Sequence, residues 1–284
     1  MQNIIIYYFS ATGNTLKVAK LYREAMTREG ANVKLSEIKA DSVPEATEYD
    51  KIGIAYPVHG FRTPEIVTAF AKRLKNTGKK TEVFSVKTSG EPLKLNDASY
   101  TELKKITEKL GYDFIGEYHY VMPYNMVFRH SDGMAARMLN TAKERVPVHA
   151  KAILAGKRTP LSSPVSAKLM SAICLIERPG MKFNGRLYRL NASKCVKCMA
   201  CVNNCPVGNI VFENGKFRFG GKCIGCARCA FNCPVDAITT GLLNPIKVNG
   251  RYDFNSPEDL SLPRYCRKSY RKYFDEDKYS PDKE

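Results

Sequence analysis

The sequence lacks an apolar run long enough to cross a bilayer. Its longest such runs, residues 4–9 and 169–176, fall far short of the roughly 20 residues that a spanning helix needs. The first residues also lack a charged segment followed by an apolar one, so we expect no secretory signal. Acidic residues are few beside basic ones, 28 against 45, and the formal net charge is +17. The sequence therefore predicts a basic chain with no membrane span.

Eight of the ten cysteines fall into two runs with the spacing C-x2-C-x2-C-x3-C-P, the second a repeat of the first. Thiolates are the ligands that iron–sulfur clusters take. A zinc ribbon also uses C-x2-C pairs, but it needs two pairs and leaves the third and fourth cysteines of each run unexplained. Cysteines used as ligands, and not as disulfides, indicate a reducing cytoplasm. The eight are Cys195, Cys198, Cys201, Cys205, Cys223, Cys226, Cys229 and Cys233.

This spacing resembles that of bacterial ferredoxins, and the resemblance implies two [4Fe–4S] clusters. In that family the fourth cysteine of each run ligates the other cluster. Cys233 would then join the first three cysteines of the first run, and Cys205 would join those of the second. Of the two remaining thiols, Cys174 is predicted to be a small buried apolar side chain. Cys266 lies among basic residues and is assigned no role.

A polar loop follows the first apolar run. Residues 3–9 have the composition of a strand buried on both faces, and apolar residues from Val18 to Ala25 then follow helical spacing up to Gly30. The loop between them, Ser-Ala-Thr-Gly-Asn-Thr at 10–15, is an anion-binding arrangement at a helix N-terminus. It has no Walker lysine and no G-x-G-x-x-G, so an ATP loop and a dinucleotide fold are both disfavoured.

The same loop closely resembles the phosphate loop of flavodoxins, [S/T]-x-T-G-N-T. The resemblance implies bound FMN and two later loops beside its isoalloxazine ring. The second of these loops has no aromatic residue, although many flavodoxins stack the ring between two. Tyr56 could instead belong to the core, and His59 could be an ordinary exposed loop residue. The residues expected at FMN are Ser10, Thr12, Gly13, Asn14 and Thr15 at the phosphate, and Tyr56, His59, Gly60, Phe61, Thr88, Ser89 and Gly90 at the ring.

Alternating strand and helix patterns predict an α/β fold, a flavodoxin-like doubly wound parallel sheet of five strands. A small α+β domain with two [4Fe–4S] clusters would follow it. Thr63 is expected to cap the helix at 64–75, and Ser99 to open a capping box for the helix at 99–110. Strands are expected at 32–37, 51–56, 81–87 and 113–121, and a further helix at about 132–156, which Pro147 should kink or split.

The expected domains are a flavodoxin-like FMN-binding domain at 1–157 and a linker with a bridging helix (about 165–177) at 158–190. The ferredoxin domain follows at 191–243, with a hairpin that turns at Asn214–Gly215. Residues 244–284 are expected to form a basic tail that is solvated or loosely docked.

The whole chain resembles the flavodoxin–ferredoxin fusions of anaerobic bacteria. The resemblance implies an electron carrier in which FMN joins two-electron to one-electron chemistry. Two other functions stay open: an FMN-dependent reductase of a quinone or small molecule, and a non-enzymatic redox docking module. No catalytic residue is assigned. With clusters and FMN counted, the charge is still about +11, which speeds encounter with acidic proteins as readily as with nucleic acid. The expected partner is a redox protein, for which an acidic one would suit this charge, and nucleic acid is not expected. The sequence does not indicate the oligomeric state.

Overall fold

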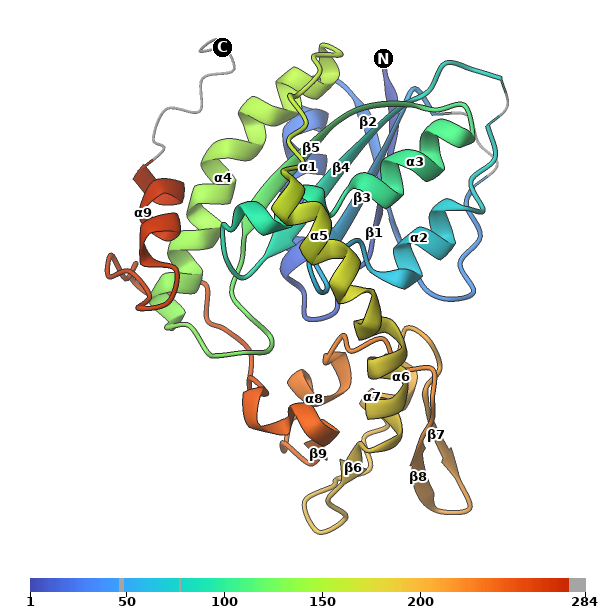
Figure 1. The fold of residues 1–284 in the computed structure, drawn as a ribbon, viewed down its shortest axis with the longest axis vertical. Helices are drawn as coiled ribbons and strands as arrows, with labels where there is room; N and C mark the ends of the chain where they lie inside the picture. The colour runs from blue at the N-terminus through green and yellow to red at the C-terminus, as the bar shows by residue number, and fades with distance from the viewer. Residues whose placement is uncertain (46–48, 77, 276–284) are drawn as a thin grey trace.

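A five-stranded parallel sheet forms the larger part of the molecule (Figure 1). The computed structural model describes residues 1–45, 49–76 and 78–275. The sheet has the expected doubly wound order β2-β1-β3-β4-β5. All four expected later strands are present, with ends shifted by at most two residues. The strands are β1 (Asn3–Tyr8), β2 (Asn32–Glu37), β3 (Lys51–Pro57), β4 (Glu82–Ser89) and β5 (Asp113–Val121).

Helices cover both faces of this sheet. On one face α1 (Asn14–Arg28) and α4 (Asp132–Leu154) bury Tyr22, Val146 and their neighbours against the strands. On the other, α2 (Glu65–Ala71) and α3 (Thr101–Lys109) bury residues such as Phe70 and Leu103. Because both faces are covered, the central strand β1 is buried from Ile4 to Tyr7 and apolar there, as the run at 3–9 predicts.

The two predicted helix caps are wrong. Residue Thr63 lies one position before the N-cap of α2, which is Pro64, and its hydroxyl donates to the Ser99 carbonyl at 2.7 Å. A short 3₁₀ helix, η1 (Lys94–Ala98), precedes Ser99, and α3 begins only at Thr101. Thr63 and Ser99 therefore join the two segments that lead into α2 and α3.

Pro147 does not split α4, which continues from Asp132 to Leu154. Val146 and Ala150, on either side of the proline, are fully buried against the sheet. Pro147 itself is exposed, so the carbonyl that it leaves without a helical donor can be solvated. Tertiary packing on both sides of Pro147 therefore outweighs the tendency of proline to break a helix.

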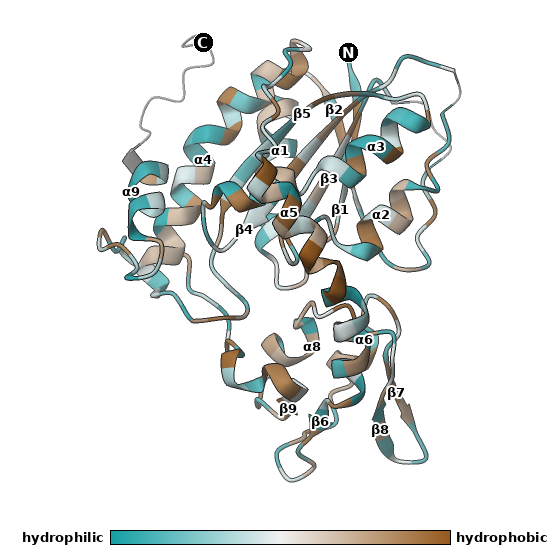
Figure 2. Ribbon diagram, in the orientation of Figure 1, coloured by the Kyte–Doolittle hydropathy of each residue, from teal (hydrophilic) through white to brown (hydrophobic). Residues whose placement is uncertain are grey.

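The linker is helical for longer than expected. It consists of α5 (Val165–Ile173), a 3₁₀ turn η2 (Cys174–Ile176) and α6 (Glu177–Arg186). Arg62 ties α5 to the sheet domain by donating to the Ser171 carbonyl at 2.8 Å. Figure 2 shows apolar residues along α5 and the following turn, and Leu169 and Ile173 are exposed. Cys174 was predicted to be buried, but it is only half-buried, because this face of the linker lies open.

The small domain below the sheet is built around two short antiparallel pairs. The first joins β6 (Arg189–Leu190) to β9 (Ile238–Thr239). The second is the expected hairpin, β7 (Ile210–Glu213) and β8 (Lys216–Phe219), which turns at Asn214–Gly215. Two single-turn helices, α7 (Ala200–Asn203) and α8 (Arg228–Phe231), lie within the two cysteine runs. Alternating helix and strand elements thus make a small α+β unit.

The segment after this domain returns to the sheet domain. It forms η3 (Gly241–Ile246) and α9 (Arg267–Asp275), and Figure 1 shows α9 beside α4. Tyr270 is fully buried, and its hydroxyl bonds to the Gly90 carbonyl and to His130. The expectation of a solvated or loosely docked tail is therefore wrong up to Asp275, because α9 carries aromatic side chains that complete an apolar cluster. Residues 276–284 lie outside the described residues. Within the described part of the chain, no helix has the length and apolarity that crossing a membrane requires.

Replacing Tyr270 by alanine should destabilise the protein by about 3 kcal/mol or more, since the change removes a fully buried aromatic ring. Thermal unfolding of the anaerobically purified protein measures the loss. Arg271→Ala, on the exposed side of the same helix, is the matched control and should change little. Equal effects of the two substitutions would show that α9 is not docked in solution.

Candidate functional site

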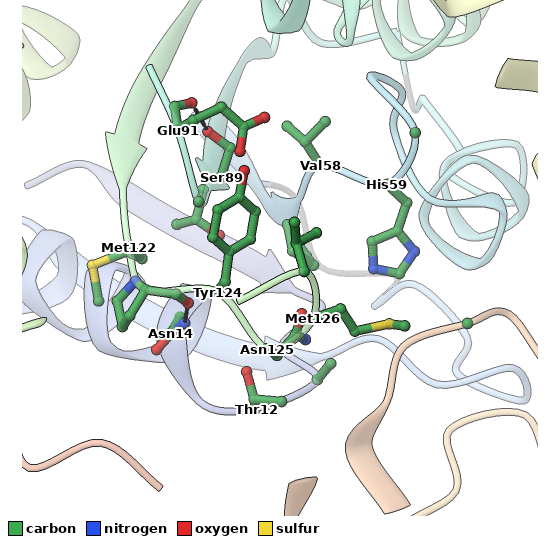
Figure 3. A pocket seen from close by; sticks show the side chains of 18 of the residues that line it. Thr12, Asn14, Val58, His59, Ser89, Glu91, Met122, Tyr124, Asn125 and Met126 are labelled. Atoms are coloured by element: carbon green, nitrogen blue, oxygen red, sulfur yellow. Dashed lines mark hydrogen bonds between the residues drawn. The ribbon is translucent and has the colours of Figure 1, made fainter. Parts of the chain in front are cut away.

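A cavity of about 380 Å³ opens at the carboxyl ends of the parallel strands (Figure 3). This is the edge at which doubly wound sheets bind ligands. Loops after β1, β3, β4 and β5 form one side of it. The other side comes from the linker, the small domain and the C-terminal segment, which contribute Glu177, Met181, Gly225, Leu243, Ile246 and Tyr265. We call it the interdomain cavity.

Most residues predicted to contact FMN line the interdomain cavity. They are Ser10, Thr12, Asn14, Thr15, His59, Gly60, Phe61, Thr88, Ser89 and Gly90. Gly13 is the N-cap of α1 and has φ +98°, a left-handed conformation that glycine adopts without strain. The structure thus brings three loops, far apart in sequence, to one place.

The first loop has the geometry of a phosphate site. It leads into α1, whose first turn carries no acidic residue, so the positive end of the helix dipole is not neutralised there. Ser10 Oγ accepts from the Leu16 amide at 3.1 Å. Asn14 donates to the Pro123 carbonyl at 2.7 Å, and the Thr15 and Thr88 hydroxyls are 2.8 Å apart. These bonds fix the loop against its neighbours, and a phosphate fits the charge and hydrogen-bonding character of the loop.

Tyr56 lies in the core and not in the cavity. Its side chain is fully buried and its hydroxyl donates to Glu117 at 2.8 Å. Successive side chains of a strand point to opposite faces, and Tyr56 belongs to the apolar cluster beneath α2 and α3. Its predicted contact with the flavin ring is therefore wrong, and the core alternative holds.

An aromatic residue that sequence analysis missed, Tyr124, lines the cavity instead. Figure 3 shows Tyr124 and His59 on opposite sides. Gly90 leaves room for the Tyr124 ring, because a Cβ at position 90 would lie 2.3 Å from that ring. The ring stacks on His130, with centroids 5.4 Å apart and planes at 11°. The signal was available, since Tyr124 follows the fifth strand, and its loop must reach the same edge of the sheet.

A buried carboxyl group also lines the cavity. Glu91 is 8% exposed, and its Oε2 has no hydrogen-bond partner among the described residues. Burial raises the pKa of Glu91 to about 7, and a bond to Asn96 opposes that shift only in part. Burial also lowers the pKa of His59 to about 4, so this imidazole is neutral at pH 7. At pH 7 His59 therefore adds no charge to the cavity, Glu91 is about half ionised, and Glu177 is a second carboxyl group in the lining.

Four thiols from both cysteine runs line a separate small cavity. They are Cys205, Cys223, Cys226 and Cys229, which we call the proximal thiols. Burial raises the pKa of Cys226 to about 12, and the charge of neighbouring Cys205 adds to the shift. Burial and Cys205 raise the pKa of Cys223 and Cys229 as well. Such thiols are kept as thiolates only by a nearby positive charge, which the irons of a cluster supply.

Both cysteine runs have the same backbone geometry. Left-handed residues occur two and four positions after the first cysteine of each: Lys197 (φ 52°) and Met199 (58°) in one, Gly225 (68°) and Ala227 (55°) in the other. Alternation of right- and left-handed residues turns successive amides inward, as in the concave nests that bind anions and iron–sulfur clusters. Two runs that share this strained pattern fit two like ligands.

Backbone amides point at sulfur in both runs. Lys197 N donates to Cys195 Sγ at 3.4 Å, and Gly225 N to Cys223 Sγ at 3.5 Å. The fourth cysteines accept in the same way, at 3.2 Å from Asn209 and from Ala237. Such bonds to sulfur stabilise thiolates and tune cluster potentials. The residues present therefore fit two [4Fe–4S] clusters.

We call Cys195, Cys198, Cys201 and Cys233 the distal thiols. Burial raises the pKa of Cys201, and the nearby charges of Cys198 and Cys195 add to the shift. Cys198 is exposed, whereas Cys226 among the proximal thiols is buried within the same apolar cluster as Phe9 and Ala11 of the sheet domain. The two thiol sets thus differ in how closely they approach the interdomain cavity.

One arginine crosses between the domains at this point. Arg228, between two proximal thiols, donates to the carbonyls of Ser10 at 2.6 Å and Ala11 at 3.2 Å. It also pairs with Glu37 at 2.9 Å, and it is only 9% exposed. Sequence analysis missed it because nothing in a cysteine run indicates which residue between the cysteines reaches another domain.

Comparison with protein families identifies both parts of the chain. A flavodoxin domain matches residues 5–113, and a 4Fe-4S binding domain matches residues 188–211 and 220–239. The chain contains a flavodoxin domain followed by a 4Fe-4S binding domain. A flavodoxin domain implies FMN, and the two matched segments imply two 4Fe-4S clusters. These are the domains of an electron-transfer flavin and iron–sulfur protein.

Several solved structures are similar to about half of this chain. A flavodoxin from Streptococcus pneumoniae TIGR4 is 17% identical, with 54% of this chain and 98% of that chain covered and a TM-score of 0.41. Flavodoxin 1 of Bacillus cereus is also 17% identical, covering 54% and 97%, with a TM-score of 0.38. An NAD(P)H:quinone oxidoreductase from Methanothermobacter marburgensis is 10% identical, covering 54% and 98%, with a TM-score of 0.40. No curated protein matches the chain.

Two double variants test the crossed ligation. Cys205→Ala with Cys223→Ala should leave one intact cluster, because both changes remove proximal thiols. Cys205→Ala with Cys195→Ala should leave none, because each cluster then loses one ligand. Iron content and EPR spectra count the clusters, and Cys174→Ala, outside both runs, should retain two. The opposite result for the two pairs would mean that each run closes on its own cluster.

Glu91→Gln should change how stability depends on pH. The folded-state pKa of Glu91 is about 7, above the ordinary value of 4.5, so the folded protein loses stability as pH rises between these values. The glutamine variant avoids that loss, up to about 3 kcal/mol, and should unfold at a higher temperature than the wild type at pH 8 but not at pH 5. Glu213→Gln, at an exposed site, is the control. An advantage of Glu91→Gln that is the same at both pH values would contradict burial of this carboxyl.

Proposed function

We propose that this protein transfers electrons within one chain, between FMN in the interdomain cavity and two [4Fe–4S] clusters, the proximal one first. FMN would be held by the loops at Ser10–Thr15, His59–Phe61 and Thr88–Gly90, with Tyr124 beside its ring. The proximal thiols would hold one cluster and the distal thiols the other. FMN exchanges one or two electrons and each cluster one, so their combination joins the two kinds of chemistry.

The observation that carries this proposal is the position of Gly225. It lies between the proximal thiols Cys223 and Cys226, yet it lines the same cavity as the phosphate loop. Met181 packs directly against it, since a Cβ at Gly225 would lie 2.6 Å from the Met181 sulfur. A flavin in the cavity would therefore be separated from the proximal cluster by little more than one backbone segment.

Contacts around Gly225 hold the two sites in a fixed relation. Arg228 binds the backbone of the phosphate loop, as described above. Asn125, from the loop after β5, donates to the Cys226 carbonyl at 3.4 Å, and the Ala40 amide donates to the Pro206 carbonyl at 3.0 Å. Electron exchange would depend on the distance between the two cofactor sites. These contacts would fix that distance, because they involve loops that carry the predicted ligands or residues that directly follow a ligand.

The side chains of the cavity also bear on its chemistry. At pH 7 His59 is neutral and Glu91, with a pKa about 7, is about half ionised, so these two side chains place at most a partial negative charge near the ring site. Leu243 and Ile246 supply apolar walls on the side of the small domain. A reducing, cytoplasmic setting suits the free thiols, and the basic charge of the chain suits an acidic redox protein as partner.

Arg228→Ala tests this arrangement. Removing the guanidinium frees the cluster loop from the phosphate loop, so internal electron exchange should slow by about 10- to 100-fold. The measurement supplies less than one electron per anaerobically purified chain. It then follows flavin and cluster absorbance by stopped flow, with FMN and iron contents determined for each variant.

Arg218→Ala, an exposed arginine of the hairpin in the same domain, is the matched control and should exchange electrons as the wild type does. If FMN and clusters in the wild type take up electrons independently, the proposed function is wrong. Steady turnover of a quinone or another small molecule from a substrate panel would favour the reductase alternative.

A further inference from the structure

A second cavity of about 380 Å³ lies in the small domain, away from the interdomain cavity. Cys195, a distal thiol, lines it, and so do the turn of the hairpin and its second strand, β8. Four cationic side chains surround it: Arg186, Arg189, Lys197 and Lys216. We call these four residues the basic patch. Three aromatic residues, Tyr188, Phe217 and Phe219, form its walls.

The charge of the basic patch is available to a partner. All four residues are exposed, and none forms an ion pair within the described part of the chain. The segment 183–222 that contains them has seven lysines and arginines and a single acidic residue, Glu213. A [4Fe–4S]2+ core with four thiolates contributes only about −2, so the surface around a distal cluster stays positive.

The surface also offers an apolar centre. Val196, next to Cys195, is 61% exposed. The aromatic walls are less open: Phe217 packs on Phe212 with centroids 4.7 Å apart, and Phe219 lies 6.0 Å from Tyr188. Transient protein interfaces combine a small apolar centre with a charged rim. Single-stranded nucleic acid binds by stacking its bases on exposed aromatic rings. The rings here already pack on each other, so the surface suits a protein partner better than nucleic acid.

The most accessible of the eight predicted ligand thiols is Cys198, a distal one. Cys198 is exposed and Cys195 half-buried, and both lie at or beside the basic patch. Cys226, among the proximal thiols, is buried against the sheet domain. An electron entering or leaving the molecule through its clusters would therefore pass the distal site.

We propose that the basic patch is the docking surface for an acidic redox protein, which exchanges single electrons with the distal cluster. This inference rests on the proposed function. In each event one electron moves between the distal cluster and the metal centre of the partner. One centre is oxidised and the other reduced, and no bond is made or broken. Opposite charge on the partner would bring its metal centre to the side of the domain where Cys195 lies.

Charge reversal at the basic patch tests this proposal. Arg186→Glu with Lys216→Glu alters two patch residues that are not ligands. Lys105→Glu with Lys109→Glu, on exposed positions of α3, changes the net charge of the chain equally and is the matched control. The probes are an acidic [2Fe–2S] ferredoxin and a basic c-type cytochrome. Second-order rates are measured from about 0.01 M to 1 M salt, where the Debye length falls from about 30 Å to about 3 Å.

The patch variant should exchange electrons with the ferredoxin at least about tenfold more slowly than the control variant at low salt. The difference should vanish at 1 M salt, and the patch variant should react faster with the cytochrome. Equal slowing by patch and control variants would mean that net charge, and not this surface, steers the partner. An RNA oligonucleotide that binds tightly and loses affinity on patch reversal would overturn the proposal in favour of nucleic acid.

Two further measurements separate this proposal from the proposed function. Iron, sulfide and EPR spectra establish that both clusters persist in each variant. Internal exchange between FMN and the clusters is measured in the same samples. If the wild type shows no internal exchange, the proposed function fails. If internal exchange is normal but reversal of the patch leaves the ferredoxin rate unchanged, only the docking proposal fails.

Discussion

A buried guanidinium is the contact on which the arrangement of the two domains depends. Burying a charge is costly unless its hydrogen bonds and its counter-charge are supplied. Arg228 finds both across the domain boundary, in the Ser10 and Ala11 carbonyls and in Glu37, and its guanidinium also lies 5.8 Å from the Phe9 ring. Its other donor reaches the Asn204 carbonyl, just before Cys205. A single side chain in the middle of the second cysteine run thereby links the phosphate loop to the end of the first run, so neither loop can shift without leaving a buried charge unpaired.

Features set by local pattern could be predicted from the sequence. The strands are predicted by apolar runs, because a strand covered on both faces needs apolar side chains on both. The hairpin is predicted by its Asn214–Gly215 turn. The cysteine spacing is equally local, because a cluster needs three thiolates on one tight loop. Loop residues such as His59 and Ser89 were found because topology brings the carboxyl ends of parallel strands together. The strands, the hairpin and the cysteine runs are thus predicted from short stretches of chain, and the cavity loops from the order of the strands.

Features set by long-range packing were missed or wrong. Pro147 was expected to kink or split its helix, but the buried residues on both sides of it keep α4 continuous. The Tyr56 side chain points into the core and the Tyr124 side chain into the cavity. No local pattern indicates that Gly90 leaves room for the Tyr124 ring. The C-terminal segment is basic and aromatic, and it was expected to be a solvated or loosely docked tail. Tyr270 is instead buried against residues more than a hundred positions earlier.

The ferredoxin domain is held at both ends, by α6 on one side and on the other by the chain that returns through η3 to α9 beside α4. A domain on a single flexible linker must find its docking position anew for each event, at a rate set by linker length and solvent friction. Two attachments, together with the arginine between them, remove that search. Under the proposed function, the pace of transfer inside the molecule would then depend on a fixed gap and on cofactor potentials, and only the encounter with an outside partner would remain diffusive.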